Sequence, residues 1–240
     1  MVNRRNFTDN LTTNLIVSVM LNDDAINRWT TPDHAWQYLN RADHIPHRRE
    51  GEQVLLDHIP LNVGRVLDLG TGDGRLLGLL KGDRPPMESI ALDFSPTMLA
   101  QASDRFREDP TVTVVAHNLD QPLPDLGNFE AIVSSFAIHH LSHERKRSLY
   151  GEIFARLQPG GIFANLEQVA SPSPALHRHF MESIGYGDQP DDPSNQLLDL
   201  HTQLTWLTDI GFEDVDCYWK WLEMALMIGV KPLDNGQKIQ

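Results

Sequence analysis

The sequence predicts an α/β domain whose sheet is mostly parallel, preceded by a helical segment. Short apolar runs that suit buried strands alternate with runs of helical periodicity, which is the pattern of parallel strands joined by helices. The first strand passes into its helix through a Gly-rich turn. Two further strands near the C-terminus suggest an antiparallel pair at the end of the sheet. The 240 residues allow one such domain, with a sizeable core and an appended segment.

Residues 1–60 precede the first strand and are expected to form a helical segment, while residues 61–240 form the α/β domain. Helices are predicted at 10–21, 31–39 and about 47–58. The second of these begins at Thr31-Pro32-Asp33, because Pro is favoured in the first turn of a helix.

Within the domain, strands are predicted at 66–69, 89–93, 112–116, 130–135, 162–166, 215–221 and 225–230. A helix with Leu76, Leu77, Leu79 and Leu80 on its buried face follows the first strand, and others are expected at 95–107, at 144–158 and before Gly211.

Local signals mark where these helices begin and end. Ser95 and Ser142 suit N-caps, and Pro159-Gly160-Gly161 should stop the helix before the fifth strand. The basic run Arg145-Lys146-Arg147 is interpreted as a solvated helix face. An excursion at about 171–195 contains a short helix and an acidic loop.

Three alternating glycines, Gly70, Gly72 and Gly74, follow the first strand. Glycine accepts positive φ, and without a Cβ it lets a ligand approach the backbone, while the helix N-terminus behind it offers unpaired N–H groups. The turn can therefore hold the anionic end of a ligand. A dinucleotide fingerprint, G-x-G-x-x-G, would need glycine where Arg75 stands, which argues against a bound pyrophosphate.

Two acids complete this pattern. Asp68 lies among apolar residues, where a carboxylate is costly unless backbone N–H groups or a cation bind it. The alternative for Asp68 is a solvent-facing acid in an ordinary strand-to-helix turn. Asp93 ends the second strand, 23 positions after Gly70, and an acid there is placed to accept both hydroxyls of a ribose. The ligand is therefore expected to be a nucleoside.

With these residues the sequence resembles the class I S-adenosylmethionine-dependent methyltransferases. Their D-x-G-x-G-x-G loop matches Asp68, Gly70, Gly72 and Gly74, and their ribose acid matches Asp93. The resemblance implies a Rossmann-like, doubly wound, seven-stranded sheet with an antiparallel end pair. It also implies S-adenosyl-L-methionine as cofactor, with S-adenosyl-L-homocysteine as product.

The resemblance extends over about 38–230 and gives roles to two other segments. It implies that residues 1–60 form a lid over cofactor and substrate, and that the excursion at about 171–195 forms a wall of the substrate site.

The same resemblance implies contacts to each part of the cofactor. Tyr38 and either Arg48 or Arg49 would approach the methionine carboxylate, for which Arg is a natural bidentate partner. Alternatively, Tyr38 packs a helix pair and the arginines face water. Phe94 and Met98 are candidates to surround the adenine.

Two further strand ends complete the implied cofactor site. The family usually has an Asp where Asn118 stands, so either Asn118 or Asp120 would accept from the adenine amine, and Leu119 offers a neighbouring backbone N–H. The backbone of Ser135 would accept from the methionine ammonium. Phe136 would cover the sulfonium side, where an aromatic ring favours a cation by about 0.5–2 kcal/mol.

His139 and Glu167 lie at strand ends that face the expected cleft, and they are candidates for a base or for acceptor binding. A base is needed only if the nucleophile is protonated at the working pH. His140 is expected to cap or pack a helix. No metal site is expected, because adjacent histidines point in different directions and no carboxylate four residues away completes a ligand set.

The composition of the chain limits the classes of substrate and partner that are expected. The net charge of −13 argues against a nucleic-acid substrate, whose binders usually carry a basic field. The fourth strand lacks the Asn- or Asp-Pro-Pro-aromatic run of enzymes that methylate amino groups of nucleic acids and proteins, so the resemblance is to the small-molecule branch. The single Cys217 fits a reducing compartment, and the apolar run at 15–21 is too short to span a membrane. A cytoplasmic protein without a membrane partner is expected, and a homodimer is left open.

The leading hypothesis is an enzyme that transfers a methyl group by in-line displacement to a small metabolite or natural-product intermediate. One alternative is an S-adenosylmethionine-binding sensor or partner subunit without catalysis. The other is a nicotinamide oxidoreductase, which Arg75 and Asp68 disfavour.

Overall fold

The computed structural model describes residues 28–187 and 189–234, so the helix predicted at 10–21 lies outside the described residues. It confirms the predicted class, because seven strands form one sheet in the order β3-β2-β1-β4-β5-β7-β6. Strands β1 to β5 are parallel, and β7 pairs antiparallel with β5 and β6. The strands are β1 Arg65–Leu69, β2 Glu88–Asp93, β3 Val112–Ala116, β4 Phe129–Ser135, β5 Leu157–Gln168, β6 Glu213–Trp221 and β7 Met224–Val230.

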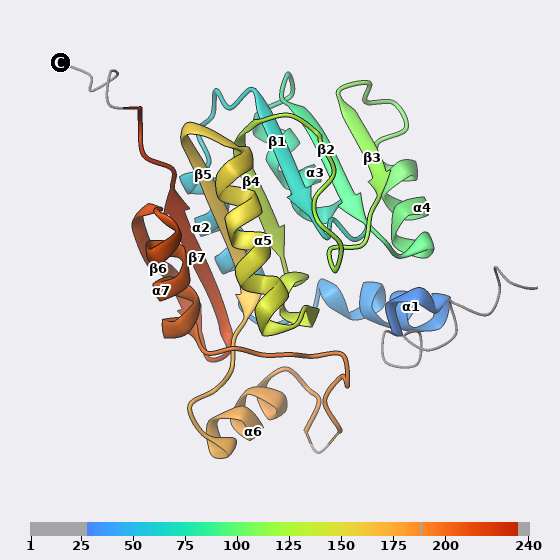
Figure 1. The fold of residues 1–240 in the computed structure, drawn as a ribbon. Coiled ribbons are helices and arrows are strands. Elements are labelled where there is room, and N and C mark those ends of the chain that lie inside the picture. The colour runs from blue at the N-terminus through green and yellow to red at the C-terminus, as the bar shows by residue number, and fades with distance from the viewer. Residues whose placement is uncertain (1–27, 188, 235–240) are drawn as a thin grey trace, which may run out of the picture.

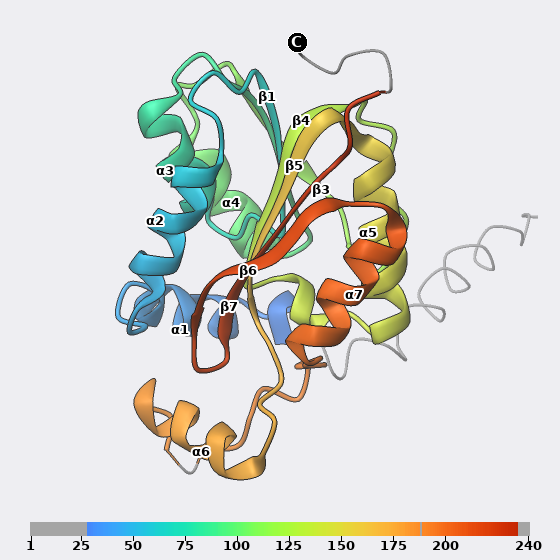
Figure 2. The ribbon, with the colours of Figure 1, turned by 90° about the vertical axis from the view of Figure 1, so that its left-hand side faces the viewer.

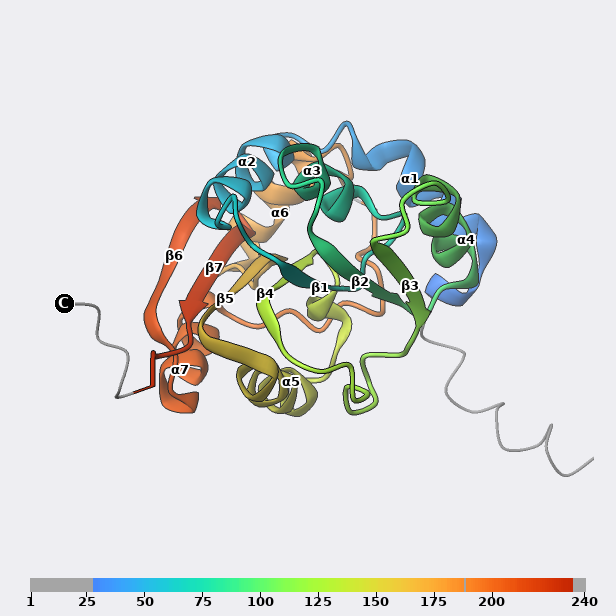
Figure 3. The same ribbon diagram turned by 90° about the horizontal axis from the view of Figure 1, so that it is seen from above.

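Helices cover both faces of this sheet, as the view from above shows (Figure 3). One face carries α2 (Arg48–His58), α3 (Arg75–Asp83) and α4 (Pro96–Arg105), and the other carries α5 (His143–Arg156) and α7 (Leu200–Ile210). In the described part of the chain, no helix combines the length and apolar character that a bilayer crossing requires.

The remaining elements gather at the edge of the sheet where the parallel strands end (Figure 1). They are α1 (Pro32–Ala42), α6 (Pro174–Ser183) and the 3-10 turns η1 (Arg28–Thr30) and η2 (Ile138–His140). Figure 2 shows from the side that α6 and α1 both lie beyond this edge.

The central strands are buried on both faces, because each face has its own apolar cluster. Val66 of β1 packs with Leu55 of α2 and Leu77 of α3, whereas the next residue, Leu67, lies in the opposite cluster with Leu149 of α5. Successive side chains of a strand point to opposite faces, and parallel sheets need cover on both. The apolar runs of the sequence are therefore the runs that the helices enclose.

The structure corrects the predicted burial of one residue in α3. Leu79 is 39% exposed, because Leu76, Leu77 and Leu80 already fill the face of the helix that packs on the sheet.

The boundary between α5 and β5 also differs from the prediction. Leu157 begins the strand instead of ending the helix, and it pairs with Phe129 of β4. The strand continues through Pro159-Gly160-Gly161, where Gly160 takes a φ of +79°. Glycine makes this irregular register possible, because it adopts positive φ without a steric penalty.

The two expected N-caps behave differently. The hydroxyl of Ser142 accepts a hydrogen bond from the backbone N–H of Arg145, as predicted. Ser95 occupies the N-cap position of α4, but its hydroxyl makes no capping bond, and its backbone N–H donates to the carboxylate of Asp93. That helix ends at Arg105, slightly earlier than expected.

The strand order creates a crevice beside the carboxyl ends of β1 and β4. From β1 the chain moves outward through β2 and β3, and it then returns to the other side of β1 as β4. Ligands of open α/β sheets bind at such a reversal. The fold thus brings the turn after β1 together with Asp93 at the end of β2 and Ser135 at the end of β4.

Candidate functional site

The Gly-rich turn leaves open space beside the backbone of Gly72. Gly70 and Gly72 have φ values of +66° and +58°. A Cβ on Gly72 would come near only the Sδ of Met98, at 4.0 Å, whereas a Cβ on Gly70 would lie 2.2 Å from the Cβ of Ala137. Gly72 therefore borders the crevice directly, and Gly70 allows the segment after β4 to approach the turn.

Gly74 lies elsewhere. It occupies the N-cap position of α3 with a φ of +80°, and a Cβ on it would lie 2.4 Å from the ring of Phe106. The third glycine of the motif thus permits close packing of α3 against the end of α4 and does not line the crevice.

Asp93 joins the turn to the start of α4. One carboxylate oxygen accepts from the backbone N–H of Gly72 at 2.9 Å, and the other accepts from that of Ser95 at 2.8 Å. Burial raises the pKa of Asp93, while these backbone bonds lower it. Since a carboxylate has about four acceptor positions, Asp93 can accept further hydrogen bonds from a ligand.

Asp68 is buried beneath the same turn. Its Oδ2 accepts a hydrogen bond of 2.6 Å from the hydroxyl of Thr71, and its Oδ1 has no hydrogen-bond partner in the described part of the chain. Burial raises the pKa of Asp68 to about 7. An unpartnered buried oxygen at a cavity wall suits a ligand group that donates a hydrogen bond.

These groups line a cavity of about 1130 Å³, including its open mouth. All but one of the residues predicted to contact the cofactor line this cavity, Gly74 being the exception: Tyr38, Arg48, Asp68, Gly70, Gly72, Asp93, Phe94, Met98, Asn118, Leu119, Ser135 and Phe136. Asp120, the alternative to Asn118, also lines it, and its backbone N–H donates to the side-chain oxygen of Asn118 at 2.9 Å.

Arg48 and Arg49 differ in burial and in position relative to the cavity. Arg48 is 4% exposed and lines the cavity, whereas Arg49 is exposed and does not. Arg48 donates from Nε to Glu52 at 2.8 Å and from Nη1 to the hydroxyl of Tyr38 at 2.9 Å. Glu52 also binds Arg75 through both carboxylate oxygens, at 2.7 and 2.8 Å, which holds α2 against the start of α3. These bonds fix Arg48 while leaving other N–H groups of its guanidinium for a ligand.

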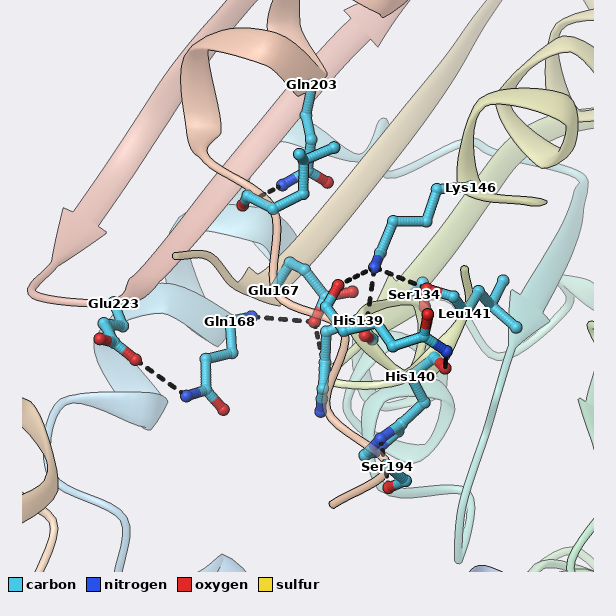
Figure 4. A network of polar contacts seen from close by, with 12 residues as sticks. Ser134, His139, His140, Leu141, Lys146, Glu167, Gln168, Ser194, Gln203 and Glu223 are labelled. Carbon is cyan, nitrogen blue, oxygen red and sulfur yellow. Dashed lines mark hydrogen bonds and ion pairs between the residues drawn. The ribbon is translucent and has the colours of Figure 1, made fainter. Parts of the chain in front are cut away.

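His139 and Glu167, which are 28 residues apart in sequence, form a buried pair (Figure 4). The Nδ1 of His139 lies 2.5 Å from Oε1 of Glu167, and the same oxygen accepts from the backbone N–H of Gln168 at 2.8 Å. The carboxylate favours the tautomer with the proton on Nδ1, so Nε2 keeps its lone pair. His139 lines a second cavity next to the first, where it can take a proton from a bound molecule.

Lys146 lies behind this pair instead of on a solvated helix face, which corrects the interpretation of the basic run. It is 1% exposed, and its Nζ donates to the backbone carbonyls of His139 at 3.2 Å, Leu141 at 2.8 Å and Gln196. Burial lowers the pKa of Lys146 to about 8, and the charge of Glu167 opposes that shift. Lys146 therefore ties η2 to the segment that follows α6.

His140 lines both cavities, a position that the sequence did not indicate. Its Nε2 accepts from the indole N–H of Trp29 at 3.1 Å, and its Nδ1 lies 2.9 Å from the hydroxyl of Ser194. Burial lowers the pKa of His140 well below its usual value, so the neutral ring that this geometry requires is favoured. No group of three or more His, Cys, Asp or Glu side chains in residues 28–187 and 189–234 is placed to hold a metal ion.

Comparisons with known proteins agree with this geometry. Residues 66–161 match a family model described as a methyltransferase domain. A carboxy-S-adenosyl-L-methionine synthase from Desulforapulum autotrophicum is 28% identical over 192 residues, which cover 72% of this chain and 76% of that protein. A demethylmenaquinone methyltransferase from Thermus thermophilus is 34% identical over 131 residues, which cover 54% of this chain and 57% of that protein.

A solved structure shares the fold. An O-methyltransferase family protein from Burkholderia thailandensis superposes with a TM-score of 0.67 at 16% identity, over 87% of this chain and 63% of that one. The family match begins in β1 and includes the glycine turn and Asp93. The sequence matches and the shared fold together support a class I S-adenosylmethionine-dependent methyltransferase.

Proposed function

We propose that this methyltransferase transfers the methyl group of S-adenosyl-L-methionine to a small molecule that binds beside His139. The observation that carries the proposal is the arrangement at Asp93 and Gly72. A buried carboxylate with acceptor capacity lies next to a backbone that has no Cβ, on the wall of one cavity. Such a wall fits a ribose on the acid and the rest of the nucleoside against the bare turn.

The same cavity offers complementary groups for the amino-acid end of the cofactor. Arg48 offers N–H groups to a carboxylate, and the unpartnered Oδ1 of Asp68 can accept from an ammonium. The backbone of Ser135 and the ring of Phe136 lie at the same cavity. The Cζ of Arg48 lies 5.2 Å from the centre of the Phe136 ring, so the arginine and this ring form one wall.

When bound, the cofactor supplies an electrophilic methyl group on a sulfonium. The protein then has to hold the acceptor in line with that methyl group, and orientation alone contributes on the order of 7–11 kcal/mol in well-ordered systems. His139 has a second task wherever the nucleophile carries a proton, because its Nε2 can accept that proton while Glu167 orients the ring.

The segments outside the sheet cover the two cavities in this proposal. Residues 1–60, described from 28 onward, act as a lid, since Trp29, Tyr38 and Arg48 line the cofactor cavity. Residues 61–240 form the methyltransferase domain. The excursion at about 171–195 forms the acceptor wall through α6 and the loop after it.

Calorimetry with S-adenosyl-L-methionine, S-adenosyl-L-homocysteine and NAD, followed by assay of S-adenosyl-L-homocysteine release over a metabolite panel, tests this proposal. Binding of the first two ligands and not of NAD is the expected result, and NAD binding alone would support an oxidoreductase. Cofactor binding without release over the panel would favour the sensor or partner subunit.

A second candidate comes from relatives that match over most of this chain. Three carboxy-S-adenosyl-L-methionine synthases match over 72%, 69% and 80% of this chain. Mass spectrometry of the ligand released from purified, denatured protein separates the two functions. An added carboxyl group on the recovered cofactor would favour the synthase.

A further inference from the structure

A second cavity adjoins the cofactor cavity and has walls from three parts of the chain. It measures about 1760 Å³ including its open mouth, and it lies between the lid residues 29–45, the segment after β4, and α6 with the loop that follows. Trp29, Tyr38, Phe136 and His140 line both cavities, so they separate the two spaces. A molecule in the second cavity therefore approaches the cofactor past Phe136 and His140.

Aromatic and aliphatic side chains form part of the lining of this cavity. Phe180, Met181 and Ile184 come from α6 and the turn after it, and Tyr186 follows them. The lid contributes Ile45. Five neutral amides also line the cavity: Gln37, Asn40, Gln168, Gln189 and Asn195. Pockets of this kind hold planar apolar molecules and orient them by a few hydrogen bonds.

The carboxylates of this wall already have histidine partners within the protein. Asp192 lies 3.1 Å from Nε2 of His34, and Asp191 lies 3.1 Å from Nε2 of His177. The Nδ1 of His177 lies 2.8 Å from the buried Glu223, which raises the pKa of His177. Both ring nitrogens of His177 face carboxylates, so the imidazolium form can donate a hydrogen bond to each of Asp191 and Glu223. Neither aspartate needs a cation from the acceptor.

The cationic side chain of this wall, Arg41, also has a partner within the protein. The guanidinium of Arg41 lies over the ring of Tyr186, 4.2 Å from its centre. A cation over an aromatic face is stabilised by the ring, and an anionic acceptor would have to compete with that contact. Asp191, Asp192 and Arg41 thus each have a partner within the protein, which favours a neutral ligand.

The basicity of His139 limits which kind of acceptor hydroxyl can lose its proton to this residue. Imidazole is strong enough to take the proton of a phenol-like hydroxyl, whose ordinary pKa is about 10, as the new bond forms. It is far too weak for an alkyl alcohol. The proton passes to Nε2 of His139 while an oxygen lone pair forms the bond to the methyl carbon. The carbon–sulfur bond breaks, its electron pair stays on sulfur, and the histidine later releases the proton to solvent.

We propose that the second cavity binds an uncharged, planar aromatic acceptor and that the atom methylated is a phenol-like hydroxyl oxygen directed at His139. This inference rests on the proposed function and names the substrate class for the same enzyme. Tyr186 acts as a specificity-determining residue, because it supplies an aromatic ring from the excursion and holds the guanidinium of Arg41 against that ring.

Calorimetric titration of the protein saturated with S-adenosyl-L-homocysteine tests the substrate class. Four probes separate charge from shape: 2-naphthol, anionic 6-hydroxy-2-naphthoate, cationic tyramine and non-aromatic decahydro-2-naphthol. We expect 2-naphthol to bind at least tenfold more tightly than each of the others. Absence of 2-naphthol binding, or equal or tighter binding of a charged or saturated probe, would overturn the inference.

Substitution of Tyr186 gives an independent check. Tyr186→Ala should weaken 2-naphthol binding about tenfold, and Tyr186→Phe should restore it. Tyr218→Ala is the matched control, because Tyr218 is an aromatic residue on β6 that lines neither cavity. Unchanged binding in Tyr186→Ala would contradict the inference. If S-adenosyl-L-homocysteine itself fails to bind, the proposed function fails instead, so the two failures are distinct.

Discussion

A methyl group added at Gly72 should block the cofactor without unfolding the protein. The structure leaves the Cβ position of Gly72 open, with only the Sδ of Met98 as close as 4.0 Å. In Gly72→Ala this methyl group would stand in the space that the cofactor needs against the turn. The variant therefore separates the demands of the fold from the demands of binding.

Two effects set the expected magnitudes. Alanine at a φ of +58° costs about 1–2 kcal/mol in the left-handed region. For a chain of this size that lowers Tm by roughly 2–8 °C. Forcing one methyl group into an otherwise well-packed contact costs about 1–3 kcal/mol. That cost corresponds to a Kd for S-adenosyl-L-homocysteine that rises about 5- to 150-fold.

Gly185→Ala is the matched control for this variant. Gly185 has a φ of +82°, a Cβ on it would meet nothing within 4 Å, and it lines neither cavity. Thermal unfolding should show a comparable loss of Tm in both variants, whereas calorimetry should show weaker cofactor binding only in Gly72→Ala. A folded Gly72→Ala protein that binds S-adenosyl-L-homocysteine with unchanged Kd would refute the placement of the ligand against this turn.

Three further substitutions address separate groups. Burial raises the folded-state pKa of Asp68 from 3.8 to about 7, so the contribution of this group to stability is complete below about pH 4 and is lost as the pH rises through 7. The Tm of Asp68→Asn minus that of the unsubstituted protein should therefore increase from pH 4 to pH 7.5. A constant difference in Tm would contradict the burial of Asp68. His139→Gln should lower kcat with 2-naphthol about 10²- to 10⁴-fold while the Kd for S-adenosyl-L-homocysteine stays within about twofold, and an unchanged kcat would exclude His139 as the base. Lys146→Met should lower both Tm and the rate of methyl transfer. The control Lys81→Met removes comparable hydrogen bonds from Nζ to the carbonyls of Pro85 and Met87, and it should lower Tm alone. Equal rates of methyl transfer in the two variants would show that Lys146 has no positioning role.

The parts of the site that could be predicted are those in which neighbouring residues act together. Asp68 lies near the end of β1, and Gly70 and Gly72 lie in the turn that follows it. The apolar runs before them and before Asp93 mark the strand ends that bring these groups to one edge. Parallel strands end at the same edge of a sheet, so order along the chain was enough to assemble these groups. Gly74 shows the limit of a motif, because its positive φ serves contact with Phe106 instead of the cavity.

Groups whose partners lie far away in sequence could not be predicted. The basic run that contains Lys146 has the composition of a solvated surface, yet Lys146 points inward because three backbone carbonyls, one of them from Gln196, receive its ammonium. Similarly, His140 and Trp29 are separated by 111 residues, and the hydroxyl of Ser194 comes from beyond α6. Hydrogen bonds between residues so far apart along the chain produce no periodic pattern in the sequence.

The same long-range bonds explain how the two cavities are joined. Trp29 can only donate, so Nε2 of neutral His140 accepts, Nδ1 donates to the hydroxyl of Ser194, and that hydroxyl donates to Asp192 at 2.8 Å. Asp192 in turn faces His34 of α1. Donation thus runs in one direction from Trp29 to Asp192, which accepts from both Ser194 and His34, and these bonds connect the lid, η2 and the acceptor wall. Moving η1 or the segment after α6 away from η2 therefore breaks a hydrogen bond to His140.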